Sequence, residues 1–86
     1  MHTLAKRLHT ITPQDVTVTL AGGERLRLGM RSAEFFQEAF QAEAVGSSGA
    51  THRIVNDGET APLVIGRRVD DGEWETLGEI VEVDRD

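Results

Sequence analysis

Short runs of alternating apolar and polar residues, separated by glycine-containing turns, most limit what this chain can fold into. Residues 16–20 place valine or leucine at every second position, and residues 25–30 do the same with leucine and methionine. Side chains along a strand point alternately to the two faces of a sheet, so each run predicts a strand with one buried face. The intervening Ala21-Gly22-Gly23 predicts the turn of a hairpin.

The register of this hairpin follows from its apolar residues, because directly paired residues share a face of the sheet. A two-residue turn would pair Val18 with Arg27, whereas a three-residue turn pairs Val18 with Leu26. The longer turn also places Gly23 at the left-handed position that a bulged hairpin turn requires. We therefore predict a three-residue turn.

The N-terminal segment predicts a helix over residues 3–11. Leu4, Leu8 and Ile11 recur at helical spacing, and Pro13 ends the segment. The last third of the chain predicts strands over residues 51–56, 63–69 and 73–83. These strands are separated by turn-rich segments.

The last hairpin is expected to turn at Asp71-Gly72, a strong two-residue hairpin sequence. That turn pairs Val69 with Trp74 on the buried face. It also pairs Arg68 with Glu75, a charge with its countercharge. Gly78 marks a bulge in the final strand.

Residues 32–45 admit two interpretations. As a helix, the segment has Ser32 as its N-cap and Gly46 as its stop, and its alanine, glutamate and glutamine residues favour this form. As a strand, residues 40–45 alternate, and residues 46–50 then form a turn into the next strand. We favour a strand over residues 37–45, with a helix over residues 33–45 as the alternative.

These elements predict one mainly β domain over residues 1–86, a small five- to six-stranded barrel or sandwich with a short N-terminal helix. If residues 33–45 are helical, the fold is α+β instead. The predicted core consists of Leu4, Leu8, Val16, Val18, Leu20, Leu26, Leu28, Met30, Phe36, Phe40, Ile54, Leu63, Ile65, Val69, Trp74, Ile80 and Val83.

The start of the chain resembles the first motif of Sm-like proteins. The resemblance rests on the alternating Val16, Val18 and Leu20, the Gly22-Gly23 turn, and the following Leu26 and Gly29. It implies a small β-barrel of the Sm-like or SH3-like kind, with RNA as a partner and assembly into a homo-oligomeric ring. The RNA-contacting Asp and Asn of that family have no clear match in residues 32–35. The chain as a whole also looks like a small haloarchaeal protein.

Composition narrows the setting and the chemistry. The chain lacks cysteine and has no apolar run long enough to span a membrane, so we expect a cytoplasmic protein without membrane partners. Its nine bases include a single lysine, against fifteen acids, which suits either a salt-rich cytoplasm or the codon bias of a GC-rich genome. The three histidines have no metal-ligand spacing, and we expect neither a metal site nor a cofactor.

The charges are distributed unevenly, and this asymmetry indicates the candidate site. Residues 1–31 carry five bases and two acids, whereas residues 32–86 carry four bases and thirteen acids. Arginine suits phosphate or carboxylate because its guanidinium donates two parallel hydrogen bonds. The candidate partner-binding residues are Arg25, Arg27, Arg31 and Arg67.

The motifs predict binding rather than catalysis. No serine lies in a nucleophile motif, and Gly46-Ser47-Ser48-Gly49 is interpreted as a flexible connection. The leading hypothesis is a non-enzymatic interaction module that binds a protein or an oligonucleotide through the basic first hairpin. One alternative is a structural subunit of a larger complex. Another is a small ligand-binding or enzyme domain that uses the carboxylates of Glu73, Glu75, Glu79 and Glu82.

Overall fold

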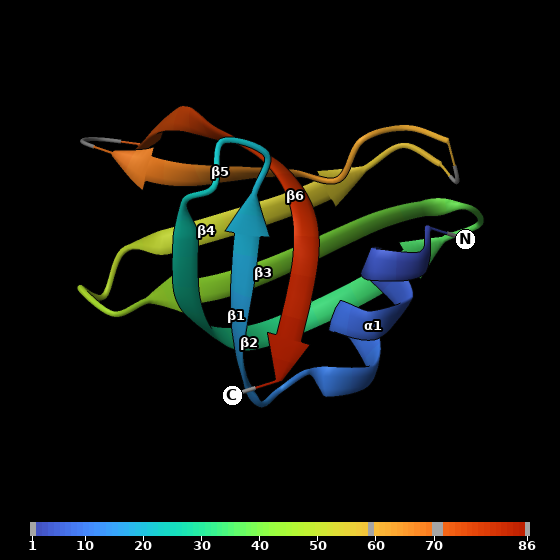
Figure 1. Ribbon diagram of the computed structural model, residues 1–86, viewed down its shortest axis with the longest axis horizontal. Coiled ribbons are helices and arrows are strands. Elements are labelled where there is room, and N and C mark those ends of the chain that lie inside the picture. The colour runs from blue at the N-terminus through green and yellow to red at the C-terminus, as the bar shows by residue number, and fades with distance from the viewer. Residues whose placement is uncertain (1, 59, 70–71, 86) are drawn as a thin grey trace.

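The computed structural model describes residues 2–58, 60–69 and 72–85. A helix, α1 (Thr3–Ile11), precedes six strands: β1 (Asp15–Leu20), β2 (Arg25–Phe36), β3 (Ala39–Gly46), β4 (Thr51–Asn56), β5 (Val64–Val69) and β6 (Glu73–Arg85). Each strand pairs antiparallel with the next, and β6 pairs back with β1 to close a barrel (Figure 1). The mainly β fold with one short N-terminal helix is therefore confirmed.

The helix α1 forms where the sequence predicts it. The side chain of His2 caps its start, since His2 Nδ1 accepts a hydrogen bond from the backbone N–H of Leu4 at 3.2 Å. The buried face consists of Ala5, Leu8 and Ile11, and it packs against β1, β2 and β6. The helix therefore completes the barrel core at one end (Figure 1).

The first hairpin has the predicted register. Val16 pairs with Leu28 and Val18 pairs with Leu26 across a three-residue turn. Gly23 has a φ of 92°, the left-handed conformation that glycine adopts without steric cost. The pairing of apolar with apolar residues therefore predicted the length of the turn correctly.

The ambiguous segment is a hairpin of β2 and β3. The favoured strand is confirmed over residues 39–45, residues 37–38 form the turn, and the helical alternative is wrong. Extended pairing continues to Phe36 opposite Ala39. The ladder shifts between Met30 and Ser32, which makes Arg31 an extra residue in β2. Beyond this bulge the alternation is displaced by one position. Phe35 therefore packs against the core, and Phe36, which we predicted to be buried, is 57% exposed.

The last hairpin corrects a second prediction. Val69 pairs with Glu73 and Arg68 pairs with Trp74, one position away from the predicted register. The indole of Trp74 is therefore 40% exposed on the outer face of the barrel. The predicted Asp71-Gly72 turn includes Asp71, which lies outside the described residues.

The predicted bulge in β6 is present. The ladder shifts between Ile65 and Gly66, which leaves an extra residue in β6 next to Gly78. Gly78 has a φ of 149°. The bend that this bulge introduces helps β6 to pair with β5 and β1 at once.

Aliphatic side chains, together with Phe40 and Met30, fill the barrel interior, as expected for a barrel of this size. Leu4 and Leu26 are only partly buried against the core, and Val69 is half-buried. The prediction omitted four core residues, two on α1 and two on β3. The buried hydrophobic residues are Ala5, Leu8, Ile11, Val16, Val18, Leu20, Leu28, Met30, Phe40, Ala42, Ala44, Ile54, Leu63, Ile65, Ile80 and Val83.

Candidate functional site

The outer face of β2 carries the basic residues that the sequence singled out. Arg25 and Arg27 pair with Thr19 and Thr17 of β1, and Gly29 continues the same outward row opposite Asp15. Arg31 follows at the bulge, where an extra residue redirects a side chain. The strand therefore presents a row of arginines that is interrupted by one glycine.

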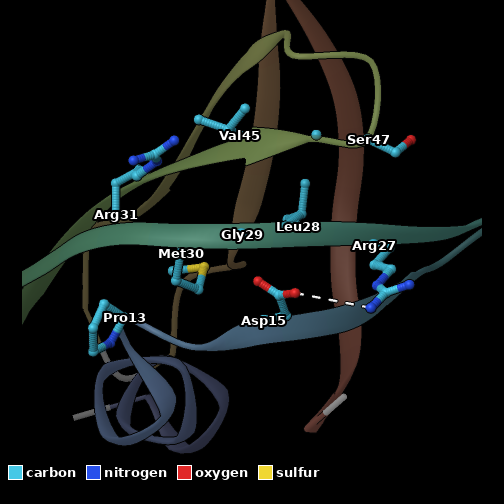
Figure 2. Close-up of a pocket in the computed structure, with 10 residues that line it drawn as sticks. Pro13, Asp15, Arg27, Leu28, Gly29, Met30, Arg31, Val45 and Ser47 are labelled. Carbon is cyan, nitrogen blue, oxygen red and sulfur yellow. Dashed lines mark ion pairs between the residues drawn. The ribbon is translucent and has the colours of Figure 1, made fainter.

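A hollow of about 580 Å³ lies over Gly29, and we call it the Gly29 groove. In Figure 2, Arg27 and Arg31 project from β2 on opposite sides of Gly29, with Asp15 on β1 and Val45 on β3 as neighbours. A Cβ atom at Gly29 would lie 3.4 Å from Asp15 Oδ1. The groove is lined by Pro13, Asp15 and residues 27–31 and 45–47.

An ion pair between Arg27 and Asp15 crosses the Gly29 groove. Arg27 Nη2 lies 3.8 Å from Asp15 Oδ2, and these side chains are 67% and 59% exposed (Figure 2). Pairs this accessible to water are screened by salt and stabilise the fold only weakly. Asp15 can therefore orient Arg27 while leaving the guanidinium accessible to a ligand.

A second, smaller hollow of about 190 Å³ adjoins the groove, and we call it the His52 hollow. It is lined by residues 25–28 and 46–48, together with His52 and Arg67. His52 pairs with Arg67, and inward-facing Ile54 follows two residues after His52 on β4. Both side chains therefore belong to the inner face of the barrel, at the end away from α1.

Neighbouring backbone holds the imidazole of His52 in place. The ring is 5% exposed, and its Nδ1 lies 2.9 Å from the carbonyl oxygen of Ala50. A Cβ atom at Gly46 would lie 2.7 Å from His52 Cε1, so the ring occupies the space that Gly46 leaves open. The glycine that ends β3 thus permits a histidine inside the barrel.

The structure places all four candidate arginines on these two hollows. Arg27 and Arg31 line the Gly29 groove, and Arg25, Arg27 and Arg67 line the His52 hollow. Arg68 is exposed and pairs with Trp74 on the outer face instead. Sequence reasoning missed His52, although its position two residues before Ile54 in an alternating strand would have placed it inside.

The candidate carboxylates of β6 are exposed, and one of them contacts Arg67. Glu75 Oε1 lies 2.9 Å from Arg67 Nη2. Glu75 therefore pairs with Arg67, and the predicted pairing of Glu75 with Arg68 is wrong. Glu73, Glu79 and Glu82 are exposed. Within residues 2–58, 60–69 and 72–85, no three acidic or histidine side chains are close enough to hold a metal ion.

Comparison with known proteins identifies the family. The model of the family described as Domain of unknown function (DUF8072) matches residues 1–86. The chain belongs to the DUF8072 family. No curated protein and no solved structure matches it. In the described part of this DUF8072 domain, no helix has the length and apolar character needed to cross a membrane.

The two hollows of this DUF8072 domain are rich in hydrogen-bond donors. Guanidinium groups donate paired hydrogen bonds to planar or tetrahedral oxyanions. The groove adds the apolar contacts of Pro13 and Val45, and the His52 hollow adds an imidazole and two serine hydroxyls. The two adjoining hollows share Arg27, Leu28, Gly46 and Ser47.

Proposed function

We propose that this domain is a non-enzymatic interaction module that binds an acidic segment of a partner protein in the Gly29 groove. The observation that carries the proposal is a hollow of about 580 Å³ with arginines on either side of a glycine floor. This volume is in the range of sites that bind organic ligands and side chains. Arg27 and Arg31 would hold carboxylates, and Pro13 and Val45 would contact the aliphatic part of the segment.

The choice of a protein over an oligonucleotide follows from the residues around the groove. Single-stranded RNA is usually held by stacking its bases on aromatic side chains. Among the described residues, none of those that line the groove is aromatic.

The chemistry of the groove favours binding over catalysis. Its one carboxylate among the described lining residues is Asp15, which is exposed and paired with Arg27. General acid–base catalysis by carboxylates usually takes place in a pocket that excludes water, whereas this ion pair is open to solvent.

Strand closure argues against assembly through a sheet edge. A structural subunit could add a partner strand to a free edge, but in this barrel β1 and β6 pair with each other. The outer groove is therefore the better candidate for contact with another protein.

The experiment that tests the proposal is a binding titration with a labelled peptide rich in glutamate and aspartate, followed by fluorescence anisotropy. The variant Arg27→Glu/Arg31→Glu is expected to weaken binding by at least about tenfold, because two charge-assisted contacts are lost and reversed. Gly29→Leu is expected to weaken binding without any change of charge, because its side chain fills the groove.

The matched control is Arg68→Glu/Arg85→Glu, which makes the same change in net charge at exposed positions outside the groove. Circular dichroism verifies that each variant is folded. An equal loss of peptide affinity in the control would show that the effect comes from net charge alone, and it would contradict the assigned site. Tighter binding of a uridine oligonucleotide of equal length would contradict the choice of a protein. Titrations in dilute buffer and in molar KCl cover the salt-rich cytoplasm that the acidic composition suggests.

A further inference from the structure

We propose that the His52 hollow is a separate site for a phosphate-type oxyanion. Its lining combines Arg25, Arg27 and Arg67 with His52 and two serines. Among the described residues, no carboxylate lines it, although the chain has fifteen acidic residues. A concentration of donors without a lining acid, in an acidic protein, is the pattern expected of an anion site. The site does not depend on the proposed function of the Gly29 groove.

The size of the hollow indicates the size of the ligand. Its volume of about 190 Å³ corresponds to roughly six water molecules. Sites for larger organic ligands typically start at about 300 Å³. A tetrahedral oxyanion with a few of its waters fits this space, so the ligand class is inorganic phosphate or a single phosphoryl group.

The buried histidine selects among oxyanions. Because a carbonyl oxygen only accepts hydrogen bonds, the 2.9 Å contact with Ala50 assigns the proton of the His52 ring to Nδ1. In the neutral imidazole, Nε2 is then an acceptor, and among the described residues it has no hydrogen-bond partner. Monohydrogen phosphate carries one O–H that can donate to Nε2, whereas sulfate carries none. We therefore expect phosphate to bind more tightly than sulfate.

Arg67 brings a positive charge to the site, and only part of its guanidinium is engaged by Glu75. One of its nitrogens, Nη2, donates to Glu75 at 2.9 Å, and the two side chains are 43% and 52% exposed. A guanidinium has five N–H donors, so this contact leaves others for an anion. Glu75 orients Arg67, but its negative charge also opposes an incoming anion. Removing that charge should therefore strengthen binding.

The serines of the β3–β4 turn complete the donor set. Ser47 and Ser48 are exposed and line the hollow. Within the described part of the chain, their hydroxyl groups make no hydrogen bond. They can therefore donate to phosphate oxygens without giving up a bond inside the protein.

The test is a titration of the full chain with sodium phosphate at pH 8, with sodium sulfate at matched ionic strength, followed by amide chemical shifts. Phosphate is expected to shift the amides of residues 46–52 and 67 with saturation, and sulfate is expected to bind several-fold more weakly. O-phosphoserine and a phosphoserine peptide are titrated in parallel. If they bind more tightly than inorganic phosphate, the source is a modified side chain, and otherwise it is free phosphate.

Four variants test which residues bind phosphate. Arg67→Gln is expected to weaken phosphate binding roughly tenfold, because one charge-assisted donor set is lost. Glu75→Gln is expected to tighten binding, a gain that a purely structural role of the ion pair does not predict. Arg68→Gln is the matched control next to Arg67, and Arg31→Gln removes an arginine of the groove alone. Both are expected to leave phosphate binding unchanged.

The proposal is overturned by any of three results. These are the absence of saturable shifts with phosphate, equal affinities for phosphate and sulfate, or equal losses in Arg67→Gln and Arg68→Gln. Since Arg31 lines only the groove and Arg67 only the hollow, failure here and failure of peptide binding are separable.

Discussion

The two ends of the barrel are built in opposite ways. At one end α1 covers the interior, and its Ala5, Leu8 and Ile11 join the hydrophobic core (Figure 1). At the other end the interior carries His52 and Arg67, and it opens into the His52 hollow. One end of the barrel is therefore closed by apolar side chains, and the other end is polar and open.

The two ends differ in what their side chains contribute to the free energy of folding. Burying apolar groups stabilises a small domain, whereas placing polar groups inside a barrel costs free energy unless they find partners. At the open end those partners are the carbonyl oxygen of Ala50 for His52 and the carboxylate of Glu75 for Arg67. We infer that the end with α1 contributes mainly stability and that the open end contributes mainly binding. Substitutions at the two ends should then have separable effects.

The largest expected effect is at the covered end. Leu8 is fully buried, so Leu8→Ala should lower the free energy of unfolding by about 2–5 kcal/mol, through lost burial and a cavity. Urea denaturation at constant pH measures the change. The exposed Lys6 on the same helix supplies the control, since Lys6→Ala should change stability by no more than about 0.5 kcal/mol.

The same variant tests whether stability and binding are separate. Where Leu8→Ala is still folded, its affinity for phosphate should equal that of the unchanged chain. A large loss of affinity in folded Leu8→Ala would show that the two ends are coupled, and the separation would then be wrong.

A smaller effect is expected at Gly46, at the open end. Gly46→Ala would place a Cβ atom 2.7 Å from His52 Cε1, and the imidazole must move. Because the ring is buried, we expect a loss of roughly 1–3 kcal/mol in stability. Phosphate affinity should fall as well, since the histidine no longer lines the hollow in the same position.

Gly22→Ala is the matched control for Gly46→Ala. Gly22 also lies at the open end, and a Cβ atom there would meet nothing within 4 Å. Urea denaturation and phosphate titration of both variants separate the contact with His52 from the general effect of replacing a glycine. Equal changes in the two variants would remove His52 from the explanation.

Two hairpins show where the sequence sufficed to predict the fold and where it did not. In the first, only one turn length paired valine with leucine instead of arginine, so the register was determined. In the last, the two-residue turn satisfied the same criterion by pairing Val69 with Trp74, yet the strands adopt the neighbouring register. Tryptophan is large and amphipathic, so its presence does not fix which face of a strand is buried.

The candidate site, like the fold, could be predicted from the sequence only in part. The uneven distribution of arginines was visible in the sequence, and the structure places all four candidates on two adjoining hollows. The hollows themselves bring together residues of several strands, and the close approach of Gly46 to His52 places the histidine in one of them. These features arise from the pairing of β2, β3 and β4 in the closed barrel, and no local pattern encodes them.

The smallest expected effect tests the corrected register. Trp74 lies on the outer face, where the guanidinium carbon of Arg53 is 4.5 Å from its ring centroid. A cation–π contact at an exposed site contributes about 0.5–1 kcal/mol. Trp74→Ala should therefore lose this contact and the covered part of the indole, and cost less in urea denaturation than Phe40→Ala, which removes a ring inside the barrel at 2% exposure and should cost about 3–5 kcal/mol.

The variant Arg53→Ala separates the two contributions to the effect at Trp74. In a double-mutant cycle, Arg53 and Trp74 should show a coupling of about 0.5–1 kcal/mol, and the remainder of the loss reports the covered part of the indole. A loss at Trp74 as large as that at Phe40, with no coupling to Arg53, would place the indole in the core. The two-residue turn and its register would then be correct, and the outward position of Trp74 would be wrong.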